Sequence, residues 1–141
     1  MFKTIFKKEK KENTEDKNIL VAALLIHAAK IDENYSDIEK KIIKEALINL
    51  NNISFDQAEK SIKLAEKKEE ESNQMLEFTR EIKKHPMEFR LKIIEIIWKI
   101  VYSDGVSDNY ESNLIRRICG LLYISDKDNG IIRTKVKNLS K

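Results

Sequence analysis

Two pairs of acidic residues are the side chains in this sequence that are best placed to do chemistry. Asp32 and Glu39 form the first pair, and Asp104 and Glu111 repeat the same spacing later in the chain. In each pair the Asp ends an apolar helical pattern, where the helix dipole disfavours a negative charge. Hard divalent cations prefer oxygen ligands. The repeated pairs therefore predict a divalent-cation site, with calcium, magnesium and manganese as the candidate ions.

The same carboxylates also have a purely structural interpretation. Ser36 and Asp108 stand three positions before Glu39 and Glu111, which is the spacing of a capping box. A capping box satisfies backbone N–H groups at the start of a helix, and it accounts well for both Glu residues. It accounts less well for the two Asp residues. Cation binding and helix capping both remain open at this point.

Other catalytic and metal-binding arrangements lack their residues. The first linker begins like an EF-hand loop, but Asp37 stands where Gly is required and Ile43 where the closing Glu is required. His27 is predicted to be a satisfied core histidine, and Cys119, the single cysteine, a buried and inert thiol. These residues offer no tetrahedral zinc site. A metal-dependent hydrolase lacks a plausible base beside the carboxylates, so we expect a non-enzymatic protein.

The elements that position these residues are predicted to be helices. Only three Gly and one Pro occur in 141 residues, so the chain has few of the residues that form hairpins and turns. An all-α single domain of six or seven helices follows. Residues 16–30 and 86–101 are apolar on nearly all faces, which predicts two central, buried helices.

Amphipathic patterns predict the remaining helices. They cover residues 36–49, 54–71, 72–84, 109–123 and 125–139. We expect Ile38 and Phe55 to face the core, and the charged residues 67–71 to form a solvated turn of helix.

An internal repeat relates the two halves of the chain. A shift of 72 positions aligns four pairs of residues: Asp32 with Asp104, Glu39 with Glu111, Ile43 with Ile115, and Leu50 with Leu122. After a deletion of one residue, Ile53-Ser54 aligns with Ile124-Ser125. The chain is therefore predicted to form two similar helical-hairpin halves around the central apolar helices.

The two ends of the chain differ in character. Residues 1–15 are predicted to be a basic, flexible tail, and residues 16–141 the helical domain. Phe2, Ile5 and Phe6 stand among lysines but precede no signal-peptide core, so residues 1–11 are expected to make at most a weak contact with an anionic membrane surface. Acidic residues are interspersed with the basic ones, which argues against nucleic-acid binding.

The second acidic pair and its earlier counterpart resemble a pattern found in a known family of helical domains. An apolar helix that ends in Asp104-Gly105, with Glu111 six residues after the Gly, and a similar unit earlier in the chain resemble the TerB-like family, a bacterial tellurite-resistance-associated helical domain. The resemblance covers most of residues 17–140. The first half departs from the pattern because Glu33 stands where Gly would be expected.

The resemblance implies an all-helical fold of two similar halves and a metal site at Asp104 and Glu111, with Asp32 and Glu39 as the earlier counterpart. It also implies a cytoplasmic protein that acts in stress response near the inner face of the membrane. We therefore expect a non-enzymatic domain that binds a divalent cation or an unidentified protein partner. The alternative is a structural interaction module whose acidic residues only cap helices and whose basic N-terminus tethers it to a membrane.

Overall fold

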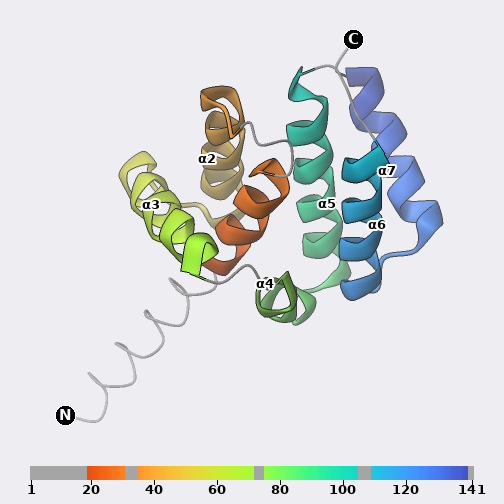
Figure 1. The fold of residues 1–141 in the computed structure, drawn as a ribbon, viewed down its shortest axis with the longest axis horizontal. Helices are drawn as coiled ribbons and strands as arrows, with labels where there is room; N and C mark the ends of the chain where they lie inside the picture. Colours follow the sequence, from red (N-terminus) through yellow and green to blue (C-terminus); the bar gives the residue numbers. More distant parts are fainter. Residues whose placement is uncertain (1–18, 31–34, 72–74, 105–108, 140–141) are drawn as a thin grey trace.

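Helices joined by short turns make up the described part of the chain (Figure 1). The computed structural model describes residues 19–30, 35–71, 75–104 and 109–139, with the backbone alone at residues 104 and 109–112. A helix over residues 19–29 is followed by α2 (Asp37–Asn51), α3 (Phe55–Glu71), α4 (Met75–Lys83), α5 (Met87–Val101), the 3-10 helix η2 (Tyr102–Asp104), α6 (Asn109–Leu121) and α7 (Asp126–Leu139). The described residues contain seven α-helices and no strand, which confirms the predicted all-α class.

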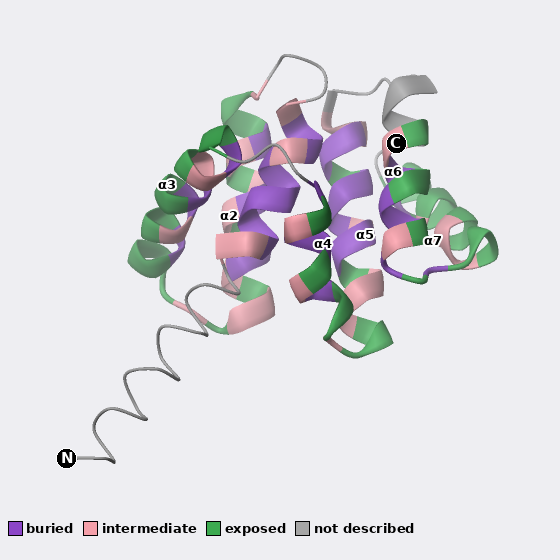
Figure 2. Cartoon of the chain, turned by 60° about the horizontal axis from the view of Figure 1, so that its bottom comes forward, coloured by how far each residue is buried: buried purple, intermediate pink, exposed green. Residues whose placement is uncertain are grey.

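The helix over residues 19–29 and α5 form the centre of the bundle, as predicted. Every residue from 21 to 26 is buried, so this helix must be covered on all sides by other helices. Seven of the fifteen residues of α5 are buried as well, including Trp98. Buried residues gather in the middle of the molecule, and exposed ones lie along the outer sides of α3 and α7 (Figure 2).

Burial repeats with the predicted offset of 72 positions. Each buried residue of α5 has a buried counterpart in the helix over residues 19–29: Ile93 with Val21, Ile94 with Ala22, Ile96 with Leu24, Ile97 with Leu25, Trp98 with Ile26, Ile100 with Ala28, and Val101 with Ala29. Two core residues of α2, Ile43 and Leu47, likewise match Ile115 and Cys119 of α6. The two similar halves are therefore present in the fold.

The turns after α2 and α6 repeat too, with the predicted deletion of one residue. Asn52 and Tyr123 follow these helices and have positive φ angles of 55° and 57°. Two residues later, the hydroxyls of Ser54 and Ser125 each accept a hydrogen bond from the backbone N–H three positions ahead, at 3.2 and 3.1 Å. Each hydroxyl therefore caps the helix that follows it.

Two core predictions were wrong. Ile38 is 63% exposed because the buried stripe of α2 runs through Glu39 and Ile43, and Ile38 lies off that stripe. Phe55 is 56% exposed because it is the first residue of α3 and lies at the end of the packed face. The Lys44 ammonium lies 4.4 Å from the centroid of the Phe55 ring and covers part of it.

Tyr123 should be the more strained of the two positive-φ residues, because a tyrosine tolerates the left-handed region less well than an asparagine. We expect Tyr123→Gly to raise the free energy of unfolding by about 0.5–1 kcal/mol. The gain is limited because the Lys83 ammonium, 4.9 Å from the ring centroid, loses its partner. Urea denaturation measures the change. Asn52→Gly is the matched control, and a destabilised Tyr123→Gly beside a neutral control would contradict the strain.

Candidate functional site

The structure places the four predicted site residues unequally. Asp32 lies outside the described residues, and so do the side chains of Asp104 and Glu111. The backbone puts Asp104 at the end of η2 and Glu111 at the third residue of α6. Only Glu39 has a described side chain among the four. The cation site at the two acidic pairs therefore stays a prediction.

Glu39 forms the predicted capping box with Ser36. The backbone N–H and the hydroxyl of Ser36 donate to Glu39 Oε1 at 3.3 and 3.1 Å, and the backbone N–H of Glu39 donates to the Ser36 hydroxyl at 3.2 Å. The Glu39 side chain is buried at the start of α2. A carboxylate at this position is also favoured by the positive end of the helix dipole. The structural interpretation of Glu39 is thus observed directly.

Carboxylates from two helices lie near Tyr35, which is the first described residue after Asp32 in the chain. The Tyr35 hydroxyl donates to Glu66 Oε1 at 3.4 Å. Burial raises the pKa of the Tyr35 phenol, and the negative charges of Glu66, Glu39 and Glu69 raise it further. Three carboxylates therefore lie near Tyr35, together with the ammonium groups of Lys40, which is 4.8 Å from the ring centroid, and of Lys30, which pairs with Glu69.

Glu69 was missed by the sequence analysis, which predicted a solvated turn over residues 67–71. The Glu69 side chain is instead buried, with the residue 5% exposed. Its Oε2 lies 2.7 Å from Lys30 Nζ, and its Oε1 lies 3.3 Å from His27 Nδ1. This arrangement ties the C-terminal end of the helix over residues 19–29 to α3.

A signal for Glu69 was present in the spacing of α3. Ala58, Ile62 and Ala65 form its buried stripe, and the next position on that stripe is residue 69. A charged residue that continues an apolar stripe needs a partner of opposite charge, because a lone buried carboxylate is costly. His27 is satisfied as predicted, because its Nδ1 contacts Glu69, but it is not a core residue, since its side chain is 22% exposed.

A second set of contacts holds η2, which ends at Asp104. The rings of Trp98 and Tyr102 stack with centroids 5.7 Å apart, and Trp98 Nε1 donates to Asn129 Oδ1 at 2.9 Å. Arg133 lies 5.0 Å from the Trp98 ring centroid and donates from Nε to the Tyr102 hydroxyl at 3.0 Å. Side chains of α7 therefore fix the backbone that leads to the second acidic pair.

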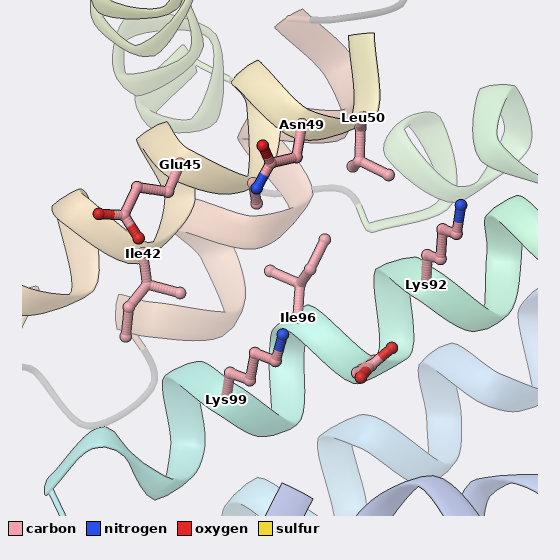
Figure 3. Close-up of a pocket in the computed structure, with 9 residues that line it drawn as sticks. Ile42, Glu45, Asn49, Leu50, Lys92, Ile96 and Lys99 are labelled. Carbon is pink, nitrogen blue, oxygen red and sulfur yellow. The ribbon is translucent and has the colours of Figure 1, made fainter. Parts of the chain in front are cut away.

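A groove between α2 and α5 is the second candidate site, and the sequence analysis did not predict it. Its volume is about 460 Å³. Figure 3 shows Ile42, Leu50 and Ile96 in the space between the two helices. Polar side chains stand around them: Glu45, Asn49, Lys92, Glu95 and Lys99. An apolar floor inside a polar rim is typical of a surface that binds another molecule.

No group of three or more His, Cys, Asp or Glu side chains is arranged to hold a metal ion in the described ranges. Within the same ranges, no helix is long and apolar enough to span a bilayer.

Replacing Glu69 tests whether the buried ion pair stabilises the fold. We expect Glu69→Gln to lower the free energy of unfolding by about 1–3 kcal/mol, because Lys30 loses its charged partner and His27 loses a carboxylate. The adjacent Glu70 is exposed, so Glu70→Gln is the matched control and should change stability by less than about 0.5 kcal/mol. Equal effects of the two substitutions in urea denaturation would contradict a special role for Glu69.

Cys119 should react slowly with iodoacetamide in the folded protein. Its side chain is buried, and burial together with the charge of Asp126 raises the pKa of the thiol to about 12. Because the thiolate is the reactive form, alkylation at pH 8 should be at least about a hundredfold slower than in guanidinium-unfolded protein. The folded-state rate should keep rising with pH above 9. Similar rates in the folded and unfolded protein would contradict a buried thiol.

Comparison with known families adds to this geometry. A family model described as Tellurite resistance protein TerB matches residues 18–134, which is most of the chain and includes all four predicted acidic residues. No curated protein and no solved structure matches the chain. The family match confirms the resemblance that the acidic turns indicated.

Proposed function

The chain belongs to the TerB family, and we propose that it is a non-enzymatic domain that binds a divalent cation at its acidic turns. The observation that supports this proposal is the group of carboxylates near Tyr35, which are Glu39, Glu66 and Glu69; the Tyr35 hydroxyl donates to Glu66 Oε1 at 3.4 Å. Asp32 and Glu39 would hold a cation there. Asp104 and Glu111 would hold one at the second turn. Calcium, magnesium and manganese are the proposed ions, because all four ligands are carboxylates.

Capping by Glu39 is compatible with this role. The hydrogen bonds from the backbone N–H and the hydroxyl of Ser36 hold Glu39 Oε1 in place at the start of α2. The capping box would therefore orient the carboxylate while it binds a cation. Oriented ligands generally bind metal more tightly than mobile ones, because less freedom is lost on binding.

The alternative function is a structural interaction module in which the acidic residues only cap helices. The complete capping box of Ser36 and Glu39 favours it. Lys30 also favours it, because its ammonium already neutralises Glu69 near the first turn. Both functions are non-enzymatic and include a protein partner, and neither includes nucleic acid.

The cellular setting is part of the same proposal. We place the protein in the cytoplasm and in stress response, with residues 1–11 in weak contact with the inner face of the membrane. Phe2, Ile5 and Phe6 would supply the apolar contact, and the neighbouring lysines would bind anionic lipid.

Thermal melting with calcium, magnesium or manganese separates the two functions. A cation that binds only the folded state should raise the melting temperature of the wild type by several degrees when it is present at about 100 times its Kd. Asp104→Asn/Glu111→Gln, which keeps the first pair, should lose the part of this response that the second pair supplies. Asp56→Asn/Glu88→Gln removes two charges from other surfaces and should respond like the wild type.

The outcome that contradicts cation binding is equally specific. If no ion moves the midpoint of the wild type, and Asp104→Asn/Glu111→Gln simply melts at a lower temperature, the carboxylates only cap helices. The interaction module then becomes the better description.

A further inference from the structure

The described parts of the two halves differ where α4 packs. This helix connects the halves but lies against the second hairpin, where it contacts α6. The centroid of its Phe78 ring lies 6.5 Å from the centroid of the His27 ring, on the helix over residues 19–29. The buried residues of α4 are Met75, Phe78, Thr79 and Ile82, which is the i, i+3, i+4, i+7 spacing of an amphipathic helix.

The groove between α2 and α5 is the repeat-related counterpart of the position that α4 occupies. The offset of 72 positions relates α2 to α6 and α5 to the helix over residues 19–29. It relates Lys99, on the rim of the groove, to His27, which contacts α4. Among the described residues, no helix covers the α2–α5 groove in the way that α4 covers its counterpart.

The exposed fractions of repeat-related residues agree with the relation between the groove and the position of α4. Ala46 and Ile96 in the groove are 9% and 8% exposed, whereas their counterparts Ile118 and Leu24 are 0% exposed. Leu50 is partly exposed, whereas its counterpart Leu122 is fully buried. The same core positions are therefore fully buried in one half and slightly more exposed in the other.

We propose that the α2–α5 groove binds an amphipathic helix of a partner protein in the way that the other half holds α4. The partner helix presents large apolar residues at positions i, i+3, i+4 and i+7 to Ile42, Ala46 and Ile96. It has an acidic flank toward α5 and a basic residue toward Glu45. This proposal concerns a different surface from the acidic turns and does not depend on cation binding.

The charges proposed for the flanks of the partner helix follow from the contacts that α4 makes. Glu77, on one flank of α4, lies 3.0 Å from Lys68 and borders a surface depression that Ile19 also lines. Lys83, on the other flank, lies over the ring of Tyr123, which follows α6. The acidic flank of α4 therefore faces the side of the helix over residues 19–29, and its basic flank faces α6.

The rim of the groove has the charges that match such a helix. Lys92 and Lys99 stand on α5, the counterpart of the helix over residues 19–29, and Glu45 stands on α2, the counterpart of α6. The remaining rim carboxylate, Glu95, lies 3.1 Å from Lys135 of α7 and is already paired. A partner helix with acidic side chains that face α5 and a basic side chain that faces α2 would complement this rim.

Other occupants match the groove less well. Phe2, Ile5 and Phe6 have the spacing of an amphipathic helix, but the residues that flank them are mostly lysines, which Lys92 and Lys99 would repel. The α4 helix of a second copy is already buried within its own chain. A partner helix with an acidic flank is therefore the occupant that the charges favour.

A peptide with the sequence of residues 72–85, labelled with a fluorophore, is the probe for this groove. We expect the full chain to bind it with a Kd of roughly 10–100 µM in fluorescence anisotropy, a modest affinity because a short peptide must become helical on binding. Ala46→Arg fills the groove and should abolish binding. Lys99→Glu should weaken binding roughly tenfold. Lys63→Glu, at an exposed lysine on α3, is the matched control and should change the Kd by less than about twofold.

Four results would overturn the proposal. The first is no binding to the wild type at about 1 mM peptide, which is weaker than any useful recognition of this kind. The second is equal binding to the wild type and to both groove variants, which would mean that the peptide exchanges with α4. The third is tighter binding of the peptide to the Phe2→Glu/Phe6→Glu variant, which would show that the N-terminal residues occupy the groove. A wild-type dimer that Ala46→Arg converts to a monomer would show that a second copy does.

The variants also need a folding control. Ala46→Arg places a large side chain beside the core, so its helical circular dichroism and melting temperature should be compared with those of the wild type. Lys99→Glu changes an exposed side chain and keeps the test decisive if Ala46→Arg fails to fold. Its Kd must rise for the proposal to stand.

Discussion

Burial of two helices that have almost no polar face is the constraint on which the rest of this structure depends. The helix over residues 19–29 and α5 must each be covered on nearly every side, and the other helices supply that cover. Polar groups are therefore displaced to the helix ends, where backbone groups also need partners. Glu39, Asp104 and Glu111 lie at such ends. Their position is a consequence of the core, whatever they bind.

The C-terminal ends of the two central helices differ in their electrostatics, although the helices themselves are alike. At the first end, Glu69 is buried with Lys30, and Tyr35 lies among carboxylates. At the second end, Arg133 and the ring of Tyr102 hold the backbone instead. A cation near Tyr35 would therefore meet charges that belong to α3, whereas side chains of α7 hold Trp98 and Tyr102 before the second pair. The repeat conserves the core and leaves the surroundings of the two turns free to differ.

Most of the fold could be predicted from the sequence, because helix periodicity and capping are local. Ser36 and Ser54 cap the helices that their spacing predicted. The buried contacts of Glu69 could not be predicted, because His27 and Lys30 lie 42 and 39 residues away and periodicity identifies a buried face without identifying its neighbour. The α2–α5 groove was missed for the same reason. A groove forms where two helices lie side by side without a third helix over them, and helix periodicity does not show which helices are neighbours.

The polar side chains of the groove explain how an uncovered position persists in a duplicated fold. Glu95 stands where the other half has the buried Ala23, and Lys92 stands where it has Leu20. These substitutions make the rim compatible with water, so the groove need not be covered for the domain to remain folded. Ile96 and Ala46 nevertheless keep the floor apolar. An apolar centre inside a charged rim is the composition of a non-obligate interface, which must be stable both when open and when occupied.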